Sequence, residues 1–421
     1  MIDGKQCTIA WHVDDTKISH IDSKVVSEVI EGIETKFGKM SVTRGEDHVF
    51  LGMHIHFRGD GTFSILMKEY LEEAIEEFGE EIIATTTSPA TKSLFIVNSN
   101  SERLYVDKAK KFHSIVAKLL YVSTRARVDL KLSIAFLCTR VTKSTEHDWR
   151  KLKRVLQYIK STLDMPRILG ADSMMHLITW VDASYAVHED MRGHTGGCMS
   201  FGLGVLMPKS SKQKFNTKSS TESEIVGGSD YIPNVIWSGL FLKHQGIILQ
   251  SSEFNQDNKS TMKLVVNGKR SCGLGSRHID IRYFFMKNRF DTENINVVYC
   301  PTGEMLADFY TKPLQGSLFR KFRDVIMGLQ HISTLKAEPI LVDQERVGRN
   351  VDLKSSESKL VLKDEFTNIP DHSRTLRETG LKINHASTDI GHDVRSVIHG
   401  GHVDTPVHRK SYADIVRSAR I

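Results

Sequence analysis

The spacing of apolar and polar residues in the first part of the chain predicts two hairpins and two helices. CTIAWHV alternates like a strand, and TKISH predicts its return strand, so the acid pair at 14–15 lies at a hairpin tip. Residues 21–37 place apolar side chains at helical spacing. HVFLGMHIHF and TFSILM predict a second hairpin that turns at residues 59–61, and residues 68–78 predict a short acidic helix.

A loop and three helices are predicted next. Residues 84–107 are rich in Thr, Ser and Asn and include Pro89, which predicts a loop or tether rather than core. Thr145 followed by Asp148 resembles a capping box and marks a helix start. Helical spacing predicts helices over roughly residues 108–125, 128–142 and 145–163.

Short strands with nearby glycines dominate from about residue 174. MHLITWVDAS, TGGCMSFG and GVLMP predict three strands, with Gly196 and Gly197 as turn glycines between them. SEFNQD and INVVYC predict two further strands, and KSTMKLVVN predicts a helix between them. Mixed strands followed by strand–helix alternation predict an α/β layer with helices on the sheet. The other helices are predicted over about 220–244, 279–293, 303–310 and 315–327.

The composition changes again beyond about residue 330. Only two aromatic residues, Phe366 and Tyr412, occur there, and charges of both signs mix with Ser, His and Gly. Such a segment cannot bury enough apolar surface to fold alone, so we expect it to be mostly disordered. The pattern as a whole predicts four regions, with the bounds 1–83, 84–165, 170–328 and 331–421.

Bulk properties narrow the class of protein but do not name a function. A chain of 421 residues is too long for one ordinary core, which predicts two to three domains. The net charge of +6 is compatible with a polyanionic partner without requiring one. The five scattered cysteines, without a CxxC pair, argue against a disulfide framework and a zinc site. No apolar run of membrane-spanning length and no signal peptide occur, so we expect an intracellular protein without a membrane partner.

Four acidic side chains carry the candidate chemistry. Asp182 lies inside the apolar strand ITWVDAS, where an unpaired charge is costly, so it should face a metal or a cleft. Asp257 ends the strand FNQD, Glu222 lies in the first turn of the long helix, and Asp308 lies on a short helix. Carboxylates from separate elements can hold two divalent cations ~4 Å apart, which activate water and stabilise the leaving oxygen in phosphodiester cleavage. Mg²⁺ suits such oxygen ligands, and Mn²⁺ is the alternative.

Each acid also has an ordinary structural explanation. A strand-end Asp is usually a turn former or a helix cap, and a first-turn Glu usually complements the helix dipole. Glu224 competes with Glu222, because the two lie on different sides of the helix and only one can face the other acids. Helical geometry alone does not choose between them.

Five short motifs carry a family resemblance. WVDASYA, TKSSTESE, QDNKS, SRHIDIRYFF and LADFYTKPL occur in this order and resemble the ribonuclease H domain of copia-type retrotransposon Pol polyproteins. The resemblance implies a ribonuclease H-like mixed sheet with flanking helices over residues 170–328, and four acids that bind two Mg²⁺ ions. The positions that match the family's acids are Asp182, Glu222, Asp257 and Asp308.

Basic residues near these acids fit a nucleic-acid backbone. Several lysines lie in the loop PKSSKQKFNTKSS, and another follows YT in the motif LADFYTKPL. Affinity for nucleic acid comes largely from phosphate contacts. A solvated lysine-rich loop is the alternative interpretation. His278 is a recurrent family position for which a structural or a substrate-backbone role is open. The candidate nucleic-acid-binding residues are Lys209, Lys212, Lys214, Lys218, His278, Arg282 and Lys312.

A second resemblance covers the first two regions. WHVDDTKISH resembles the catalytic hairpin of reverse transcriptases, with Asp14 and Asp15 as its acids and His12 where Tyr or Phe is usual. HVFLGMHIHF and KFHSIVAKLLYVSTRARVDLKLSIAFL also resemble copia-type polyproteins. The likeness implies a partial reverse transcriptase palm over 1–83 and thumb- or connection-like helices over 84–165. Such polymerases need a third Asp upstream and fingers, so we expect an incomplete metal site and no independent polymerase activity.

Together these inferences predict a Mg²⁺-dependent nuclease that cuts the RNA strand of RNA–DNA hybrids and uses no small-molecule cofactor. Two alternatives are a catalytically silent retroelement remnant that only binds nucleic acid, and part of an RNA-directed DNA polymerase if the missing palm and fingers are supplied. The start inside a palm predicts a truncated gene model or a decayed element copy. The resemblance implies a cytoplasmic virus-like particle or the nucleus as location, and the sequence leaves the oligomeric state open.

Overall fold

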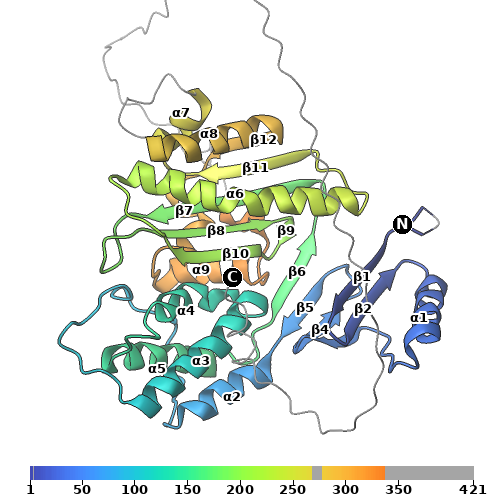
Figure 1. Ribbon diagram of the computed structural model, residues 1–421, viewed down its shortest axis with the longest axis horizontal. Coiled ribbons are helices and arrows are strands. Elements are labelled where there is room, and N and C mark those ends of the chain that lie inside the picture. Colours follow the sequence, from blue (N-terminus) through green and yellow to red (C-terminus); the bar gives the residue numbers. More distant parts are fainter. Residues whose placement is uncertain (3, 268–276, 337–421) are drawn as a thin grey trace, which may run out of the picture. The chain divides into compact units, whose positions relative to one another are not determined.

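The strands form two five-stranded sheets and one two-stranded hairpin in the computed structural model, which describes residues 1–2, 4–267 and 277–336 (Figure 1). Helices pack on these sheets, so the predicted mixed α/β class is confirmed. The described part of the chain falls within one unit of dense internal contacts, Met1–Val342. No helix among these residues combines the length and the apolar character that a membrane crossing requires.

The first hairpin forms as predicted, whereas the segment HVFLGMHIHF forms two strands instead of one. Asp22 caps the first helix, because its carboxylate accepts the backbone N–H of Lys24. HVFLGMHIHF splits into two strands at Leu51 and Gly52, which both have positive φ and form a tight turn. The elements are β1 (Cys7–His12), β2 (Asp15–His20), α1 (Ser23–Phe37), β3 (Asp47–Phe50), β4 (Met53–Phe57), β5 (Phe63–Leu66) and α2 (Lys68–Phe78).

The sheet that contains β3, β4 and β5 is completed by strands from much later in the chain. β6 (Arg167–Ala171) pairs antiparallel with β5, and β9 (Gly202–Leu203) pairs antiparallel with β6, which gives the order β3-β4-β5-β6-β9. The buried Arg167 guanidinium donates to the backbone oxygens of Arg125 and Val205, one on each side of this junction. The predicted boundary near residue 165 therefore crosses a continuous sheet.

The helical region agrees closely with the prediction. Thr145 and Asp148 form the predicted capping box at the start of the third helix. A buried ion pair joins Arg127 to Asp129 at 2.8 Å between Nη2 and Oδ2, and the Tyr158 hydroxyl also donates to Asp129 at 2.8 Å. The elements are α3 (Val106–Arg125), the short 3₁₀ helix η1 (Val128–Leu130), α4 (Lys131–Cys138) and α5 (Glu146–Lys160).

The second five-stranded sheet has the order β10-β8-β7-β11-β12. β8 and β10 run antiparallel to their neighbours, whereas β11 runs parallel to both β7 and β12. The strands are β7 (His176–Ser184), β8 (His194–Ser200), β10 (Leu206–Lys212), β11 (Ser251–Gln256) and β12 (Ile295–Tyr299). The helices are α6 (Ser220–His244), α7 (Lys259–Asn267), α8 (Arg277–Thr292) and α9 (Gly316–Ile326), with 3₁₀ helices η3 (Thr302–Glu304), η4 (Leu306–Tyr310) and η5 (Ile332–Leu335).

Two adjacent glycines let α6 and η4 pack closely on opposite faces of this sheet. A Cβ atom on Gly196 would lie 2.6 Å from Cγ2 of Thr311 and 2.9 Å from the backbone oxygen of Ala307. A Cβ atom on Gly197 would lie 2.5 Å from the ring of Tyr231 on α6. Successive strand residues face opposite sides, so each glycine makes room for one layer. The prediction that both are turn glycines is wrong, because both lie inside β8.

A buried histidine pair supports η4 from the sheet. His188 Nε2 lies 3.0 Å from His194 Nδ1, and His194 Nε2 lies 2.8 Å from the Ser210 hydroxyl, which donates to the backbone oxygen of Tyr310. Burial lowers the pKa of His188 to about 4 and that of His194 to about 3, so both imidazoles are neutral near pH 7. The chain of hydrogen bonds thus connects the β7–β8 loop to the end of η4.

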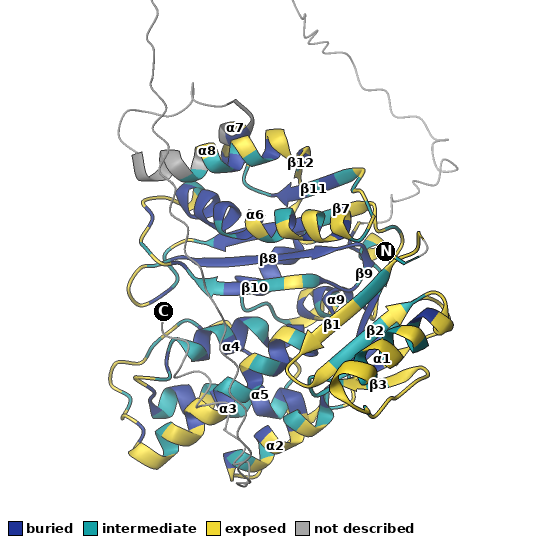
Figure 2. Cartoon of the chain, turned by 45° about the vertical axis from the view of Figure 1, so that its right-hand side comes forward, coloured by how far each residue is buried: buried dark blue, intermediate teal, exposed yellow. Residues whose placement is uncertain are grey.

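Burial differs between the second sheet and the N-terminal hairpin with its helix, and it continues past the predicted start of the tail. β8 is buried along its whole length, whereas β1 and α1 are largely exposed (Figure 2). Leu335 on η5 is buried, and His331 Nε2 lies 2.8 Å from an Asp172 oxygen, so ordered structure extends through Lys336. The rest of the predicted tail, 337–421, lies outside the described residues.

Candidate functional site

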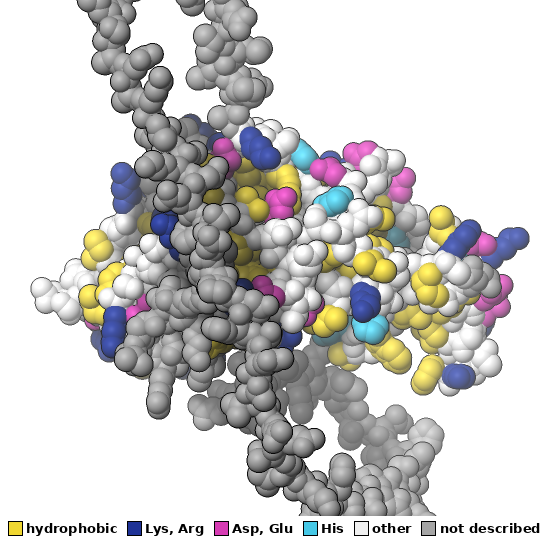
Figure 3. Space-filling view, turned by 90° about the horizontal axis from the view of Figure 1, so that it is seen from above, with side chains coloured by type: hydrophobic (Ala, Val, Ile, Leu, Met, Phe, Trp, Pro, Cys, Tyr) yellow, Lys and Arg dark blue, Asp and Glu magenta, His cyan; other side chains and the backbone are white. Residues whose placement is uncertain are grey.

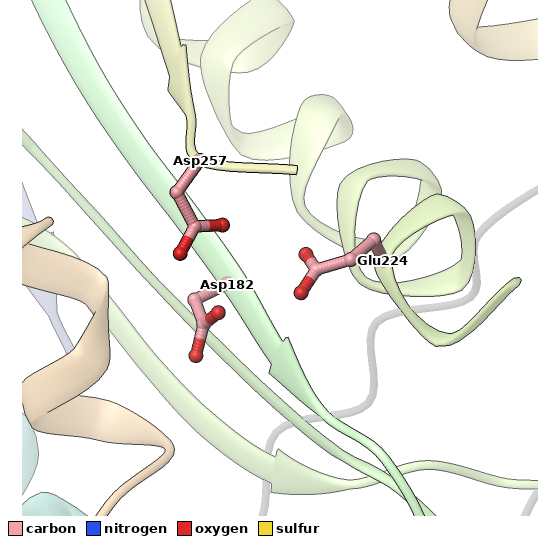
Figure 4. A group of neighbouring side chains, drawn as sticks. All are labelled: Asp182, Glu224 and Asp257. Carbon is pink, nitrogen blue, oxygen red and sulfur yellow. The ribbon is translucent and has the colours of Figure 1, made fainter. Parts of the chain in front are cut away.

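Three carboxylates from three different elements converge beside the second sheet. Asp182 on β7, Glu224 in the first turns of α6 and Asp257 just after β11 each place an oxygen within 4.8 Å of the other two (Figure 4). Asp182 and Glu224 are buried, and Asp257 is half-buried. We call these three residues the acid cluster. Such a group of hard oxygen donors fits a divalent cation.

The glutamate of this cluster differs from the sequence-based choice. Ser219 caps α6 by accepting the backbone N–H of Glu222, which fixes the position of Glu222 in the first turn. The Glu222 carboxylate turns back and accepts the backbone N–H of Lys218. Glu224 lies two residues on, about 200° around the helix, and faces β7. The prediction that Glu222 faces the other acids is therefore wrong in geometry, and Glu224 takes its place.

Close packing of α6 on β7 brings Glu224 to the cluster. A Cβ atom on Gly227 would lie 3.1 Å from Cβ of Ala183, so the helix approaches the strand next to Asp182. The buried Gln256 side chain donates from Nε2 to Glu224 Oε2 at 3.3 Å. Its own oxygen accepts the backbone N–H of Asn258 at 3.0 Å, which fixes the orientation of the amide. Gln256 thus holds the Glu224 carboxylate from the strand side.

Asp308 joins the acid cluster through a lysine. It lies on η4, whose backbone packs against Gly196 directly opposite Asp182 in the β7–β8 pairing. Lys312 Nζ lies 2.7 Å from Asp308 Oδ1 and 3.6 Å from Asp182 Oδ2. The Thr311 hydroxyl donates to the same Asp182 oxygen. The structure therefore brings together three of the four predicted acids, and adds Glu224 and Thr311.

The crowding of acids shifts the pKa values of this site. Burial raises the pKa of Glu224 well above its usual range, and the charges of Asp182 and Asp257 raise it further. Burial and then Asp182 also raise the pKa of Asp257, against the effect of Lys312. The pKa of Asp308 rises to about 7 for the same reasons. Burial is thus the first cause of these shifts and repulsion between the carboxylates the second, and a bound cation would relieve the repulsion.

Three of the predicted phosphate contacts already have protein partners. Lys209 donates from Nζ to the backbone oxygen of Asp230 at 2.7 Å, and Arg282 forms an ion pair with the carboxylate of the same residue at 2.5 Å. Lys212 pairs with Asp190 at 2.6 Å. A nucleic acid would have to compete with these internal partners, which weakens the case for the three basic residues as a group.

Two predicted lysines lie on open surface. Lys214 and Lys218, in the loop between β10 and α6, are exposed. On the face shown in Figure 3, the lysine and arginine side chains of the described residues are scattered among neutral and acidic ones. His278 lies on α8, but its side chain falls outside the part that the structure describes. The role of these residues in nucleic-acid binding stays a prediction.

Asp14 and Asp15 lie at the exposed tip of the β1–β2 hairpin. Within residues 1–2, 4–267 and 277–336, they take part in no group of three close metal-ligating side chains.

Comparison with known proteins finds relatives among retrotransposon Pol polyproteins. No protein-family model matches the chain. Over 320 residues, or 74% of its length, it is 26% identical to the retrovirus-related Pol polyprotein from transposon RE2 of Arabidopsis thaliana. Over 321 residues, or 75% of its length, it is 22% identical to the corresponding polyprotein from transposon TNT 1-94 of Nicotiana tabacum. The chain spans only 21% and 24% of these two relatives.

A shorter relative matches the chain over most of its own length. An uncharacterized mitochondrial protein of Arabidopsis thaliana is 27% identical over 214 residues, 51% of this chain and 86% of that protein. The homologues confirm the predicted resemblance to retrotransposon Pol polyproteins.

Two solved structures also align with the chain. One is a foamy viral protease-reverse transcriptase in complex with double-stranded DNA, at 15% identity and a TM-score of 0.39 over 70% of this chain and 55% of that one. The other is the N-terminal RNase H domain of a Mycobacterium tuberculosis protein, at 12% identity and a TM-score of 0.23 over 32% of this chain and 91% of that one.

Proposed function

We propose that this chain is the nuclease part of a retrotransposon Pol polyprotein and that it cuts the RNA strand of RNA–DNA hybrids. The observation that carries the proposal is the convergence of Asp182, Glu224 and Asp257 from separate elements to within 4.8 Å, with Asp308 next to them. The homologous Pol polyproteins support the same kind of activity.

The residues fit divalent metal ions as the cofactor. The donors are all carboxylate oxygens, which Mg²⁺ and Mn²⁺ accept, and burial together with the charge of Asp182 raises the pKa values of Glu224 and Asp308. Bound ions of this kind supply an activated water and neutralise the leaving oxygen in phosphodiester hydrolysis.

The side chains around the carboxylates would hold them in place for such ions. Thr311 orients Asp182 through its hydroxyl, and Gln256 orients Glu224 through its amide. Both supporting side chains are buried, so the carboxylates they hold keep their positions without help from solvent.

The choice of an RNA–DNA hybrid as substrate depends on chemistry and on the relatives together. The relative from transposon RE2 is named a retrovirus-related Pol polyprotein. Copying RNA into DNA, as retroviruses do, creates RNA–DNA hybrids. A hybrid is recognised through its backbone shape and 2′-hydroxyl groups rather than through base edges. The exposed Lys214 and Lys218, which precede α6, are the basic side chains best placed for phosphate contacts.

A cleavage assay tests this proposal. The purified chain is incubated with end-labelled RNA–DNA hybrid, double-stranded DNA or double-stranded RNA, in Mg²⁺ or in EDTA. We expect cutting of the hybrid's RNA strand in Mg²⁺ only, and its loss in Asp182→Asn. Asp291→Asn, which removes an exposed carboxylate on α8, is the matched control and should cut normally.

Two outcomes would contradict the proposal. Equal cleavage by the chain and by Asp182→Asn would reject the acid cluster as the active site. Mg²⁺ binding without any cleavage would instead identify a catalytically silent remnant.

A further inference from the structure

Lys312 is not placed as a contact to substrate would be. Its ammonium group lies between two carboxylates, 2.7 Å from Asp308 Oδ1 and 3.6 Å from Asp182 Oδ2. It follows Asp308 by four residues, across the end of η4, so the local backbone directs it back toward the acids. A cation that binds Asp308 and Asp182 together would need the same space.

The surroundings of Lys312 make this position stable without a metal ion. Both carboxylate side chains are 3% exposed, so water screens their repulsion poorly. The lysine side chain is 40% exposed, so its stem reaches solvent and the ammonium group can swing outward. The group therefore has one position among the acids and an accessible alternative outside them.

We propose that Lys312 is a built-in counter-ion that joins Asp308 to Asp182 in the metal-free chain and that a divalent cation displaces when it binds between these two acids. This inference rests on the proposed function, because it assumes that the acids bind metal. It adds that the chain contains its own competitor for one of the two cation positions. The other position is the one among Asp182, Glu224 and Asp257, whereas the ion pairs of Lys312 are with Asp308 and Asp182.

Two consequences follow for metal binding. The chain binds one cation more weakly than the other, because only one of them has to displace an ammonium group. Without Lys312, the metal-free chain loses the charge that holds Asp308 and Asp182 together, so it becomes less stable while its weaker metal position becomes stronger. A lysine that only packs locally would change the stability and leave the metal affinity as it was.

The test measures metal binding in the absence of nucleic acid. Lys312→Met and Lys312→Gln are compared with the unaltered chain by Mg²⁺ titration calorimetry and by thermal unfolding in EDTA and in Mg²⁺. We expect both variants to bind the weaker Mg²⁺ about two- to fivefold more tightly, the scale of a partly screened ion pair. We also expect both to melt at lower temperature in EDTA. If Lys312→Met does not fold, Lys312→Gln carries the test, because its amide keeps a hydrogen bond to Asp308.

Two controls separate charge from general effects. Lys312→Arg keeps the positive charge and should bind Mg²⁺ as the unaltered chain does. Lys287→Met removes a lysine that pairs with Asp291 at 3.1 Å, also four residues apart, and should leave Mg²⁺ affinity unchanged.

The outcomes distinguish the inference from the proposed function. If the unaltered chain binds Mg²⁺ and Asp182→Asn does not, but both neutral variants bind as the unaltered chain does, the counter-ion role is overturned and the nuclease proposal stands. If the unaltered chain does not bind Mg²⁺ at all, the nuclease proposal fails and the inference fails with it.

Discussion

The choice between two glutamates of α6 gives the sharpest test of the site. Glu224 faces Asp182 and Asp257, whereas the Glu222 carboxylate accepts a backbone N–H at the start of the same helix. Replacing each by Gln keeps the size of the side chain and removes only its charge. We expect Glu224→Gln to abolish Mg²⁺-dependent cleavage of the hybrid and Glu222→Gln to preserve it.

The separation of the acids sets the size of the effect. Two unit charges within 4.8 Å of each other repel by at least roughly 3.5 kcal/mol at an effective dielectric constant of about 20. Because the pKa of Glu224 is raised, partial protonation already relieves much of this repulsion. We therefore expect Glu224→Gln to stabilise the metal-free chain by about 1–2 kcal/mol, a few degrees in melting temperature. In Mg²⁺ the lost ligand should lower cleavage at least a hundredfold, or about 2.7 kcal/mol of transition-state stabilisation.

The Glu222 variant should behave in the opposite way. Its amide oxygen can still accept the backbone N–H of Lys218, and the loss of a favourable charge in the first turn of α6 should cost about 0.3–1 kcal/mol. Cleavage should stay within about threefold of the unaltered chain, a change of less than 1 kcal/mol. Initial cleavage rates and melting curves in EDTA and in Mg²⁺ provide the measurements. A larger loss of activity in Glu222→Gln than in Glu224→Gln would refute the assignment.

Three further predictions test the support of the site. Gly196→Ala and Gly197→Ala each add one methyl group against a packed layer and should each cost about 1–3 kcal/mol in urea unfolding. Only Gly196→Ala, on the η4 side, should also lower cleavage at temperatures where both variants are folded, and equal activity would argue against a role of η4. Asp129→Asn leaves its buried arginine partner uncompensated and should cost about 3–5 kcal/mol, whereas a loss below 1 kcal/mol would show that the pair contributes little. His188 and His194 have pKa values lowered to about 4 and about 3, so the stability they confer is present above about pH 6.5 and is lost as the pH falls toward these values. Urea unfolding in EDTA from pH 7 to pH 4 should therefore show a shallower decline for His194→Gln than for the unaltered chain, and equal slopes would contradict this cause.

Local patterns predicted most of the elements, because hydrophobic spacing and capping act within a few residues. The long helix α6, the capping box at Thr145 and the strand that carries Asp182 all follow from such patterns. The choice of Glu222 failed for a physical reason. The two glutamates are two positions apart on α6, so they point in different directions around the helix. The close contact of Gly227 with β7 decides which of them faces the sheet. No local pattern in the sequence indicates this contact.

The same limit applies to the other residues that were missed. Gly196 and Gly197 look like turn residues, because glycine is frequent in turns, yet here they provide room for two packed layers. Thr311 lies three residues after Asp308, and only the folded chain shows that its hydroxyl reaches Asp182. A signal for Lys312 was present, since it follows Asp308 at helical spacing, but its basic character pointed first to phosphate.

The pairing of β6 with β5 has a practical consequence for anyone who prepares fragments of this chain. A recombinant piece that begins at residue 170 would cut through β6 and remove Arg167 together with β5, so only Gly170 and Ala171 of β6 would remain beside β9 and would form an exposed sheet edge. Unpaired edges of this kind promote self-association, so poor solubility of such a piece would say little about its catalytic competence. The shortest fragment worth expressing therefore starts ahead of β3, even if only the second sheet performs chemistry.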